Sequence, residues 1–102
     1  MAVYNKLIRD KIPAIIQQTG CKANTRILSD EEYRVWLERK LDEEVGEFHR
    51  DHTVEELADI LEVVYALAAT CGCSREQLEV TCQTKRKSKG GFERKLFLIS
   101  TE

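Results

Sequence analysis

Three helix-start motifs in succession limit what this chain can fold into. In each, Ser or Thr is followed three residues later by Glu or Gln, so that the two side chains satisfy backbone N–H groups left unpaired in a first helical turn. The pairs are Ser29 with Glu32, Thr53 with Glu56, and Ser74 with Gln77. With Gly72, Gly90 and Gly91 as stops, they predict helices over about 29–50, 53–71 and 74–88. We therefore expect one all-α domain spanning residues 1–102.

The segments outside these motifs predict smaller elements. Pro13 suits the first turn, and Gly20 the end, of a short helix over about 11–19. Residues 22–28 lack helical periodicity, and residues 94–100 have the composition of a short strand. The expected fold is a helical bundle built on an antiparallel helix hairpin, with a minor two-stranded β-ribbon from the 22–28 and 94–100 segments.

Bulk composition excludes several classes of function. Apolar residues make up 42% of the chain and charged residues 33%, which supports a core, although a thin one at this length. The net charge of −2 disfavours binding of nucleic acid polymers through bulk charge. The longest apolar run, Val63 to Ala69, is far shorter than the roughly 20 residues of a membrane span. Because the N-terminus carries no apolar signal segment, we expect a cytoplasmic protein whose four cysteines are reduced thiols.

A carboxylate interrupts the apolar stripe of the helix predicted over 29–50. At the helical period, that stripe is formed by Tyr33, Leu37, Leu41, Val45 and Phe48. Glu44 falls inside it, while Glu47 lies at its edge and Glu43 further out. A buried carboxylate costs several kcal/mol unless a cation or a basic partner compensates it. Glu44 is therefore the acidic residue that an ordinary solvated helix surface explains least well.

The helix predicted over 53–71 also places carboxylates on an apolar side. From Ile60 to Ala69 its only charged residue is Glu62, so we expect burial on most sides and an oligomer interface, in a homodimer or a higher homo-oligomer. Glu56 and Asp59 share the side of its apolar residues and are expected to point inward. The link to the preceding helix is short enough for an antiparallel hairpin.

The hairpin is expected to gather four carboxylates near its closed end, namely Glu44, Glu47, Glu56 and Asp59. Four such groups cannot all stay ionised in one small region without cations. Hard divalent ions, Mg²⁺ or Mn²⁺, take oxygen ligands and leave positions open for phosphates. The alternative for each acid alone is plainer: Glu56 completes the helix cap of Thr53, and Glu43 and Glu47 are solvated helix charges.

A family resemblance joins these residues. Glu43-Glu44-x-x-Glu47 followed by Glu56-x-x-Asp59 resembles the signature of the all-α nucleotide pyrophosphohydrolases, the MazG-like and phosphoribosyl-ATP pyrophosphohydrolase-like proteins. The opening from Tyr4 to Pro13 and the late Lys85 … Lys89-Gly90-Gly91-Phe92 are similar to the ends of the small phosphoribosyl-ATP pyrophosphohydrolase-like subgroup. Two features depart from the family pattern: only eight residues separate Glu47 from Glu56, and Lys89 stands where relatives carry arginine.

The resemblance implies hydrolysis of a nucleotide between its α- and β-phosphates, with release of pyrophosphate. The candidate substrates are phosphoribosyl-ATP and a surplus or damaged deoxynucleotide. It implies that Glu43, Glu44 and Glu47 are catalytic, with Glu43 as the general base. It also implies that Glu44, Glu47, Glu56 and Asp59 hold Mg²⁺, and that the phosphates meet Lys6, Arg9, Lys85 and Lys89.

Two other interpretations remain open at this stage. The late lysines also suit the negative end of a helix dipole, which would explain them without a ligand. The whole chain could equally be a catalytically inactive nucleotide-binding protein or a helical dimerisation module.

Overall fold

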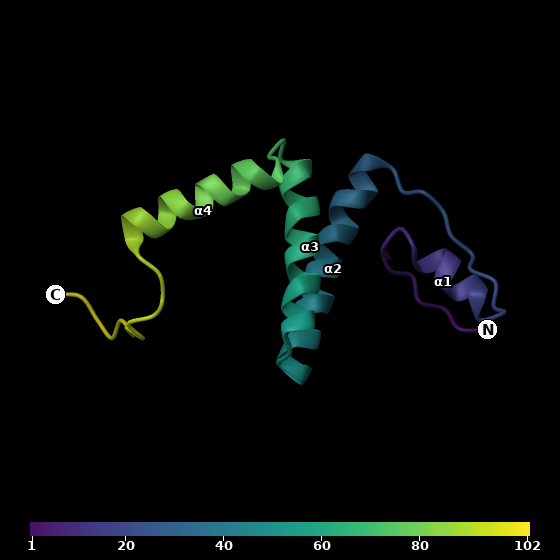
Figure 1. Ribbon diagram of the computed structural model, residues 1–102, viewed down its shortest axis with the longest axis horizontal. Coiled ribbons are helices and arrows are strands. Elements are labelled where there is room, and N and C mark those ends of the chain that lie inside the picture. Colours follow the sequence, from purple (N-terminus) through teal and green to yellow (C-terminus); the bar gives the residue numbers. More distant parts are fainter.

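The computed structural model describes residues 1–102 and contains four helices and no strand (Figure 1). The helices are α1 (Ile12–Gln18), α2 (Asp30–Asp51), α3 (Val54–Thr70) and α4 (Arg75–Lys89). The expected all-α class is confirmed, and each predicted boundary lies within one residue of the observed one. Local signals at the helix ends were sufficient for this because capping satisfies backbone groups within a few residues of the end.

The capping motifs form as expected at two of the three helix starts. Ser29 accepts a hydrogen bond from the Glu32 N–H at 3.2 Å, and the Glu32 carboxylate accepts one from the Ser29 N–H at 3.1 Å. The same reciprocal pair opens α4. At α3, Thr53 Oγ1 accepts from the Glu56 N–H at 3.4 Å, but the Glu56 carboxylate makes no return bond. The Glu56 side chain is therefore free for another role.

Helices α2 and α3 form the antiparallel hairpin at the centre of the molecule (Figure 1). The chain reverses at His52, whose left-handed backbone (φ 53°) ends α2 and whose N–H donates to the Phe48 carbonyl at 2.8 Å. The imidazole of His52 meets the Phe48 ring edge-on, with centroids 5.4 Å apart. Leu37 on α2 and Val63 on α3 are the buried apolar side chains, and their removal from water favours the folded hairpin.

The rest of the chain extends to either side of the hairpin. Helix α4 leaves α3 at a bend of 103°, after a turn in which Gly72 adopts a φ of 73°. The radius of gyration is 17.8 Å, against about 13 Å for a compact domain of this length. Only three of the 102 residues are buried. A single copy of the chain therefore has little interior of its own.

The expected β-ribbon does not form. Residues 22–28 run between α1 and α2, whereas residues 94–100 lie beyond α4 at the opposite end of the molecule (Figure 1). Lys95 adopts a left-handed backbone, with a φ of 60°, which breaks the extended run. The prediction was wrong because α4 carries the tail away from its intended partner, and no hydrophobic face supports a lone strand.

No single helix of the chain is long and apolar enough to cross a membrane. Helices α3 and α4 reach the necessary length and composition only when they are taken together, across their bend of 103°.

Candidate functional site

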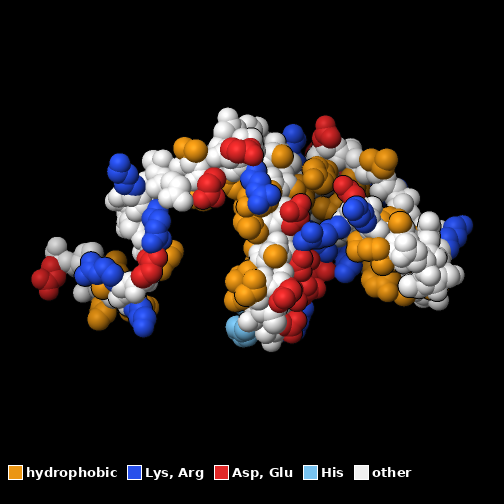
Figure 2. Space-filling model, in the orientation of Figure 1, with side chains coloured by type: hydrophobic (Ala, Val, Ile, Leu, Met, Phe, Trp, Pro, Cys, Tyr) orange, Lys and Arg blue, Asp and Glu red, His pale blue; other side chains and the backbone are white.

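The hairpin gathers four carboxylates from its two helices. Glu44 and Glu47 lie one turn apart on α2, and Glu56 and Asp59 lie one turn apart on α3. Each residue contributes one oxygen to a group in which all members lie within 4.8 Å of one another. We call these four residues the acidic cluster. Figure 2 shows the acidic side chains gathered along the hairpin, with Lys and Arg beside them on the side of the N-terminal segment. The predicted convergence of these four residues is confirmed.

Two oxygens of the acidic cluster are buried without a hydrogen-bond partner. They are Glu44 Oε2 and Glu56 Oε2. The Glu44 side chain as a whole is only 9% exposed. A carboxylate oxygen removed from water and given no donor is costly, and such groups in native proteins are usually paired or bind a cation. The donor set is made entirely of carboxylate oxygens, which is the chemistry that Mg²⁺ and Mn²⁺ prefer.

The protonation of Glu44 and Glu56 responds to this crowding. Burial raises the pKa of Glu44, and nearby Glu47 raises it further, against the opposing effect of Lys40. Burial of the Glu56 carboxylate and the close approach of Glu47 raise the pKa of Glu56 from 4.5 to about 6. Both shifts report carboxylates that are short of positive charge.

Three basic side chains border the acidic cluster. Lys40 is 14% exposed and its Nζ lies 3.3 Å from both a Glu43 and a Glu44 oxygen. From the N-terminal segment, Arg9 Nη2 donates to Asp59 Oδ1 at 2.7 Å. The structure therefore brings Arg9 to the acidic cluster, and its contact with substrate phosphates stays a prediction.

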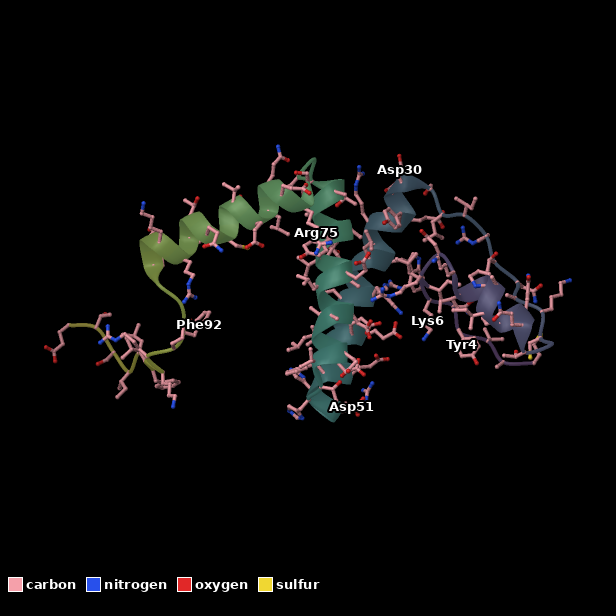
Figure 3. All side chains as sticks on the ribbon, in the orientation of Figure 1. Tyr4, Lys6, Asp30, Asp51, Arg75 and Phe92 are labelled. Atoms are coloured by element: carbon pink, nitrogen blue, oxygen red, sulfur yellow. The ribbon has the colours of Figure 1, made fainter.

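Lys6 and Glu43 form a second contact between the N-terminal segment and α2. Lys6 Nζ donates to Glu43 Oε1 at 3.1 Å, and Figure 3 shows Lys6 between the segment and the hairpin. Burial by itself raises the pKa of Glu43, but the hydrogen bonds from Lys6 and Lys40 outweigh it and leave the pKa lowered. The same hydrogen bond raises the pKa of Lys6. Glu43 is thus ionised at neutral pH and lies beside the acidic cluster rather than in it.

The charges around the site do not balance. The acidic cluster and Glu43 carry five negative charges when ionised, whereas Lys6, Arg9 and Lys40 supply three positive ones. The remaining two negative charges are the amount that one divalent cation neutralises. Both the unpaired oxygens and the charge balance therefore fit a bound divalent ion.

Lys85 and Lys89 are not brought to the acidic cluster within one chain. They lie in the second half of α4, which points away from the hairpin, and Phe92 marks the chain beyond it (Figure 3). Their position in the last turns of α4 suits the helix dipole, which was the alternative explanation. The distance of these lysines from the acidic cluster depends on the direction of α4 after the turn at Gly72. Motif spacing along the sequence carries no information about that direction.

Lys40 is a site residue that was not among the candidates drawn from the sequence. Its ammonium is the sole ion-pair partner of buried Glu44. The signal was present in the sequence, since Lys40 precedes Glu43 and Glu44 by three and four residues, the spacings at which helical side chains meet.

Comparison with known proteins gives a similarity over part of the chain. No protein-family model matches the chain. No solved structure matches it either. The chain is similar to a protein described as uncharacterized from Mycolicibacterium smegmatis (strain ATCC 700084 / mc(2)155), with 46% identity over 48 residues. The matched stretch covers 47% of this chain and 49% of that protein, so it spans about half the length of the relative.

The raised pKa of Glu56 predicts a pH dependence of stability in metal-free protein. Between pH 4.5 and about 6 the folded chain keeps a proton on Glu56 that the unfolded chain has lost. The free energy of unfolding should therefore fall as pH rises through this interval and stay lower above it. Glu56→Gln should be more stable than the wild type at pH 7 and close to it at pH 4, in thermal melts with EDTA.

Exposed Glu55, the neighbour of Glu56 on α3, provides the matched control. Glu55→Gln should leave the pH dependence of the wild type in place. Equal destabilisation by Glu56→Gln at every pH would contradict the assignment.

Proposed function

We propose that the chain is a Mg²⁺-dependent nucleotide pyrophosphohydrolase, which cleaves a nucleoside triphosphate or a related nucleotide between its α- and β-phosphates. The observation that carries the proposal is the acidic cluster, whose four carboxylates each bring an oxygen within 4.8 Å of the others and two of which have a buried oxygen without a partner. The resemblance of Glu43-Glu44-x-x-Glu47 and Glu56-x-x-Asp59 to the family signature supports it. We place this activity in the cytoplasm, in the upkeep of nucleotide pools.

The acidic cluster would hold the metal through Glu44, Glu47, Glu56 and Asp59, with Mn²⁺ as a substitute for Mg²⁺. When bound, the ion supplies charge neutralisation on the phosphate oxygens and a lower pKa for the attacking water. Lys40 keeps the buried Glu44 carboxylate compensated on its other oxygen, at 3.3 Å. The protein contributes a fixed arrangement of carboxylates that costs no reorganisation during the reaction.

The residues at the rim of the acidic cluster handle the substrate. Lys6 and Arg9 are the more exposed of the cations beside it, and they would exchange their carboxylate partners for phosphate oxygens. Glu43 is ionised and lies outside the cluster, which suits it to accept the proton of the attacking water. Hydrolysis adds one water across the anhydride and yields a nucleoside monophosphate and pyrophosphate.

Metal binding is expected to stabilise the folded protein. Because only the folded hairpin assembles the cluster, Mg²⁺ at 100 times its Kd should add about 2.7 kcal/mol. The increase in Tm on adding Mg²⁺ should be absent in Glu44→Ala and retained in Glu62→Ala, since Glu62 is exposed and is not a member of the cluster. Equal Mg²⁺-dependent increases in the wild type and Glu44→Ala, measured by thermal melting, would rule out the cluster as the metal site.

The activity itself is testable with a panel of ribonucleotides and deoxyribonucleotides in Mg²⁺, with pyrophosphate detection. At least one nucleotide should release pyrophosphate. Glu47→Gln should lose more than the roughly 10- to 100-fold that loss of an outer-shell partner costs, because a ligand is removed. Glu62→Gln should turn over like the wild type. No release from any nucleotide would reject the enzyme, and tight calorimetric binding without product would identify a nucleotide-binding protein instead.

We also infer that the working unit is a homodimer or a larger homo-oligomer. The chain exposes 9226 Å², whereas a compact monomer of 11.8 kDa exposes about 5,900 Å². Large apolar side chains of α3 contribute to this excess, with Leu57 48% and Leu61 45% exposed. Large obligate interfaces between subunits bury areas comparable to the difference between these two exposed areas. A second copy of the chain is the simplest cover for an apolar surface on a core helix.

Light scattering at micromolar concentration should give at least twice the 11.8 kDa mass of one chain. Leu61→Gln should lower the mass by placing an amide in the apolar contact. The adjacent Glu62→Gln provides the matched control, since it also ends in an exposed amide on α3 and should leave the mass unchanged. A monomer in the wild type would contradict the inference.

A further inference from the structure

The C-terminal part of the chain has no cover of its own. Helix α4 and the tail after it stand away from the hairpin (Figure 1), and every residue from Glu79 to Glu102 is exposed. We call residues 79–102 the C-terminal arm. Five large apolar side chains of its tail are at least 76% exposed, namely Phe92, Leu96, Phe97, Leu98 and Ile99. An isolated helix as short as α4 is marginal in water, and an exposed apolar surface of this kind marks an interaction site.

The turn between α3 and α4 holds the C-terminal arm away from the hairpin of its own chain. At the end of α3 the Cys73 N–H donates to the Ala68 carbonyl at 2.9 Å, and the reciprocal cap opens α4 directly afterwards. The Arg75 guanidinium lies over the Tyr65 ring, 4.3 Å from its centroid. Because the turn is bonded on both sides of the 103° bend, the cover of the arm comes from another molecule.

The charges of the C-terminal arm and of the hairpin are opposite. Residues 30–70 of the hairpin carry thirteen acidic and four basic side chains, a net charge of −9. Residues 85–95 of the arm carry six basic side chains and one acidic side chain, a net charge of +5. Of these six cations only Arg86 forms an ion pair within the chain, with Glu93 of the arm itself. The other five suit an acidic surface, and every copy of the chain presents one on its hairpin.

Helix α3 carries an exposed apolar surface on this acidic hairpin. Val54, Leu57 and Leu61 are each at least 45% exposed, and their spacing of three and four residues places them on one face of the helix. We call these three residues the α3 stripe. Figure 2 shows exposed hydrophobic side chains along the hairpin. The α3 stripe therefore provides apolar contact and the surrounding hairpin provides negative charge.

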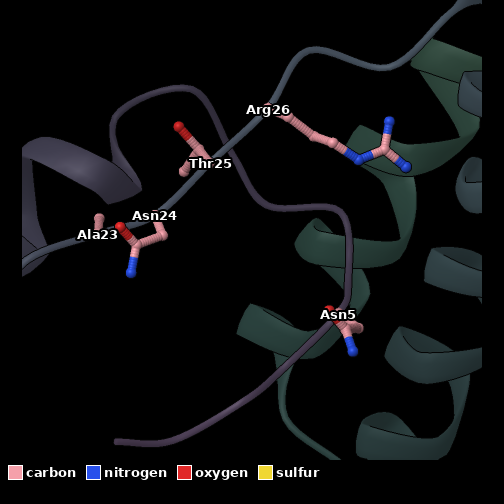
Figure 4. A pocket seen from close by; sticks show the side chains of 5 residues that line it. All are labelled: Asn5, Ala23, Asn24, Thr25 and Arg26. Carbon is pink, nitrogen blue, oxygen red and sulfur yellow. The ribbon is translucent and has the colours of Figure 1, made fainter.

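The hollow beside the N-terminal segment does not suit the apolar tail. Only one of the residues that line it is apolar, and the lining residues are Asn5, Ala23, Asn24, Thr25 and Arg26 (Figure 4). Burying the tail against these polar side chains would desolvate them without giving them partners.

We propose that the C-terminal arm of each copy packs across the α3 stripe of a second copy, so that two chains exchange arms. The proposal rests on the inferred homo-oligomer and assigns its contact, which is arm on α3 and not α3 on α3. The exchange is reciprocal, so the assembly closes at two chains. Each chain exposes roughly 3,300 Å² more than a compact monomer of its mass, an area of the order that large obligate interfaces bury.

An anionic lipid surface is the competing partner for the C-terminal arm, because cations next to aromatic and aliphatic side chains also suit lipid. The second copy is the better match. One association covers both the arm and the α3 stripe and brings opposite charges together, whereas lipid bound to the arm leaves the α3 stripe in water.

Phe97→Ser tests the C-terminal arm. Phe97 is 88% exposed within one chain, so its loss leaves the hairpin intact and removes an aromatic contact only from the exchanged dimer. The dissociation constant of the dimer should rise about tenfold or more, measured by sedimentation equilibrium. Ile27→Ser is the matched control, since Ile27 is 98% exposed and belongs to neither surface. An unchanged dissociation constant in Phe97→Ser would refute the arm as the contact.

A mixture of two variants distinguishes arm exchange from packing of α3 on α3. Phe97→Ser has a defective arm and Leu61→Gln a defective α3 stripe, so each should be a monomer at a concentration where the wild type is a dimer. In the mixture, the arm of Leu61→Gln meets the α3 stripe of Phe97→Ser, and one contact is intact. Mixing should therefore restore a species of two chains.

The matched control mixes Leu61→Gln with Leu57→Gln. Both variants have a defective α3 stripe, so this mixture should restore nothing. Failure of the mixture of Phe97→Ser and Leu61→Gln to restore the dimer would overturn the exchange.

These measurements separate the inference from hydrolysis, because they use neither nucleotide nor metal. Restored dimers in a protein that releases no pyrophosphate would support the exchange and reject the enzyme. A wild type that is monomeric at micromolar concentration would contradict the exchange, whatever its activity. If that monomer floats with vesicles of phosphatidylserine and phosphatidylcholine, the C-terminal arm binds lipid instead.

Discussion

The fold of the hairpin imposes a repulsive arrangement on the rest of the structure: two pairs of carboxylates face one another across it. The tight reversal at His52 leaves little freedom in how α2 and α3 face each other, so Glu44 and Glu47 meet Glu56 and Asp59 within 4.8 Å. Burial removes water from two of their oxygens and raises the pKa values of Glu44 and Glu56. Such an arrangement costs stability unless a cation compensates it, and this cost is the reason that we propose a metal site there.

The N-terminal segment is held in place by the same charges. It has no helix before Ile12 and few apolar contacts, yet Lys6 and Arg9 attach it to residues that lie 37 and 50 positions away. Exposed ion pairs of this kind contribute little stability on their own, because solvent screens them. Their value in this chain is positional. They bring cations to the acidic cluster.

The parts of the fold and site that could be predicted from the sequence are those governed by local rules. The helix ends at Ser29 and Ser74 follow from hydrogen bonds within one turn, and the burial of Glu44 follows from its apolar neighbours at helical spacing. The β-ribbon prediction was wrong, because strand pairing requires that two distant segments meet and α4 carries residues 94–100 away. The separation of Lys85 from the acidic cluster has the same cause.

The sequence by itself determined the helices, the order of the acidic residues along them, and the placing of Glu44, Glu47, Glu56 and Asp59 on the inward side of a hairpin. These follow from periodicity and from a link too short to allow anything but a tight reversal. Only the tertiary structure decided which cations border the cluster and that the Glu56 carboxylate makes no return bond to its cap. Those features arise between segments far apart in the chain, where the outcome is set by three-dimensional approach and not by spacing along the sequence.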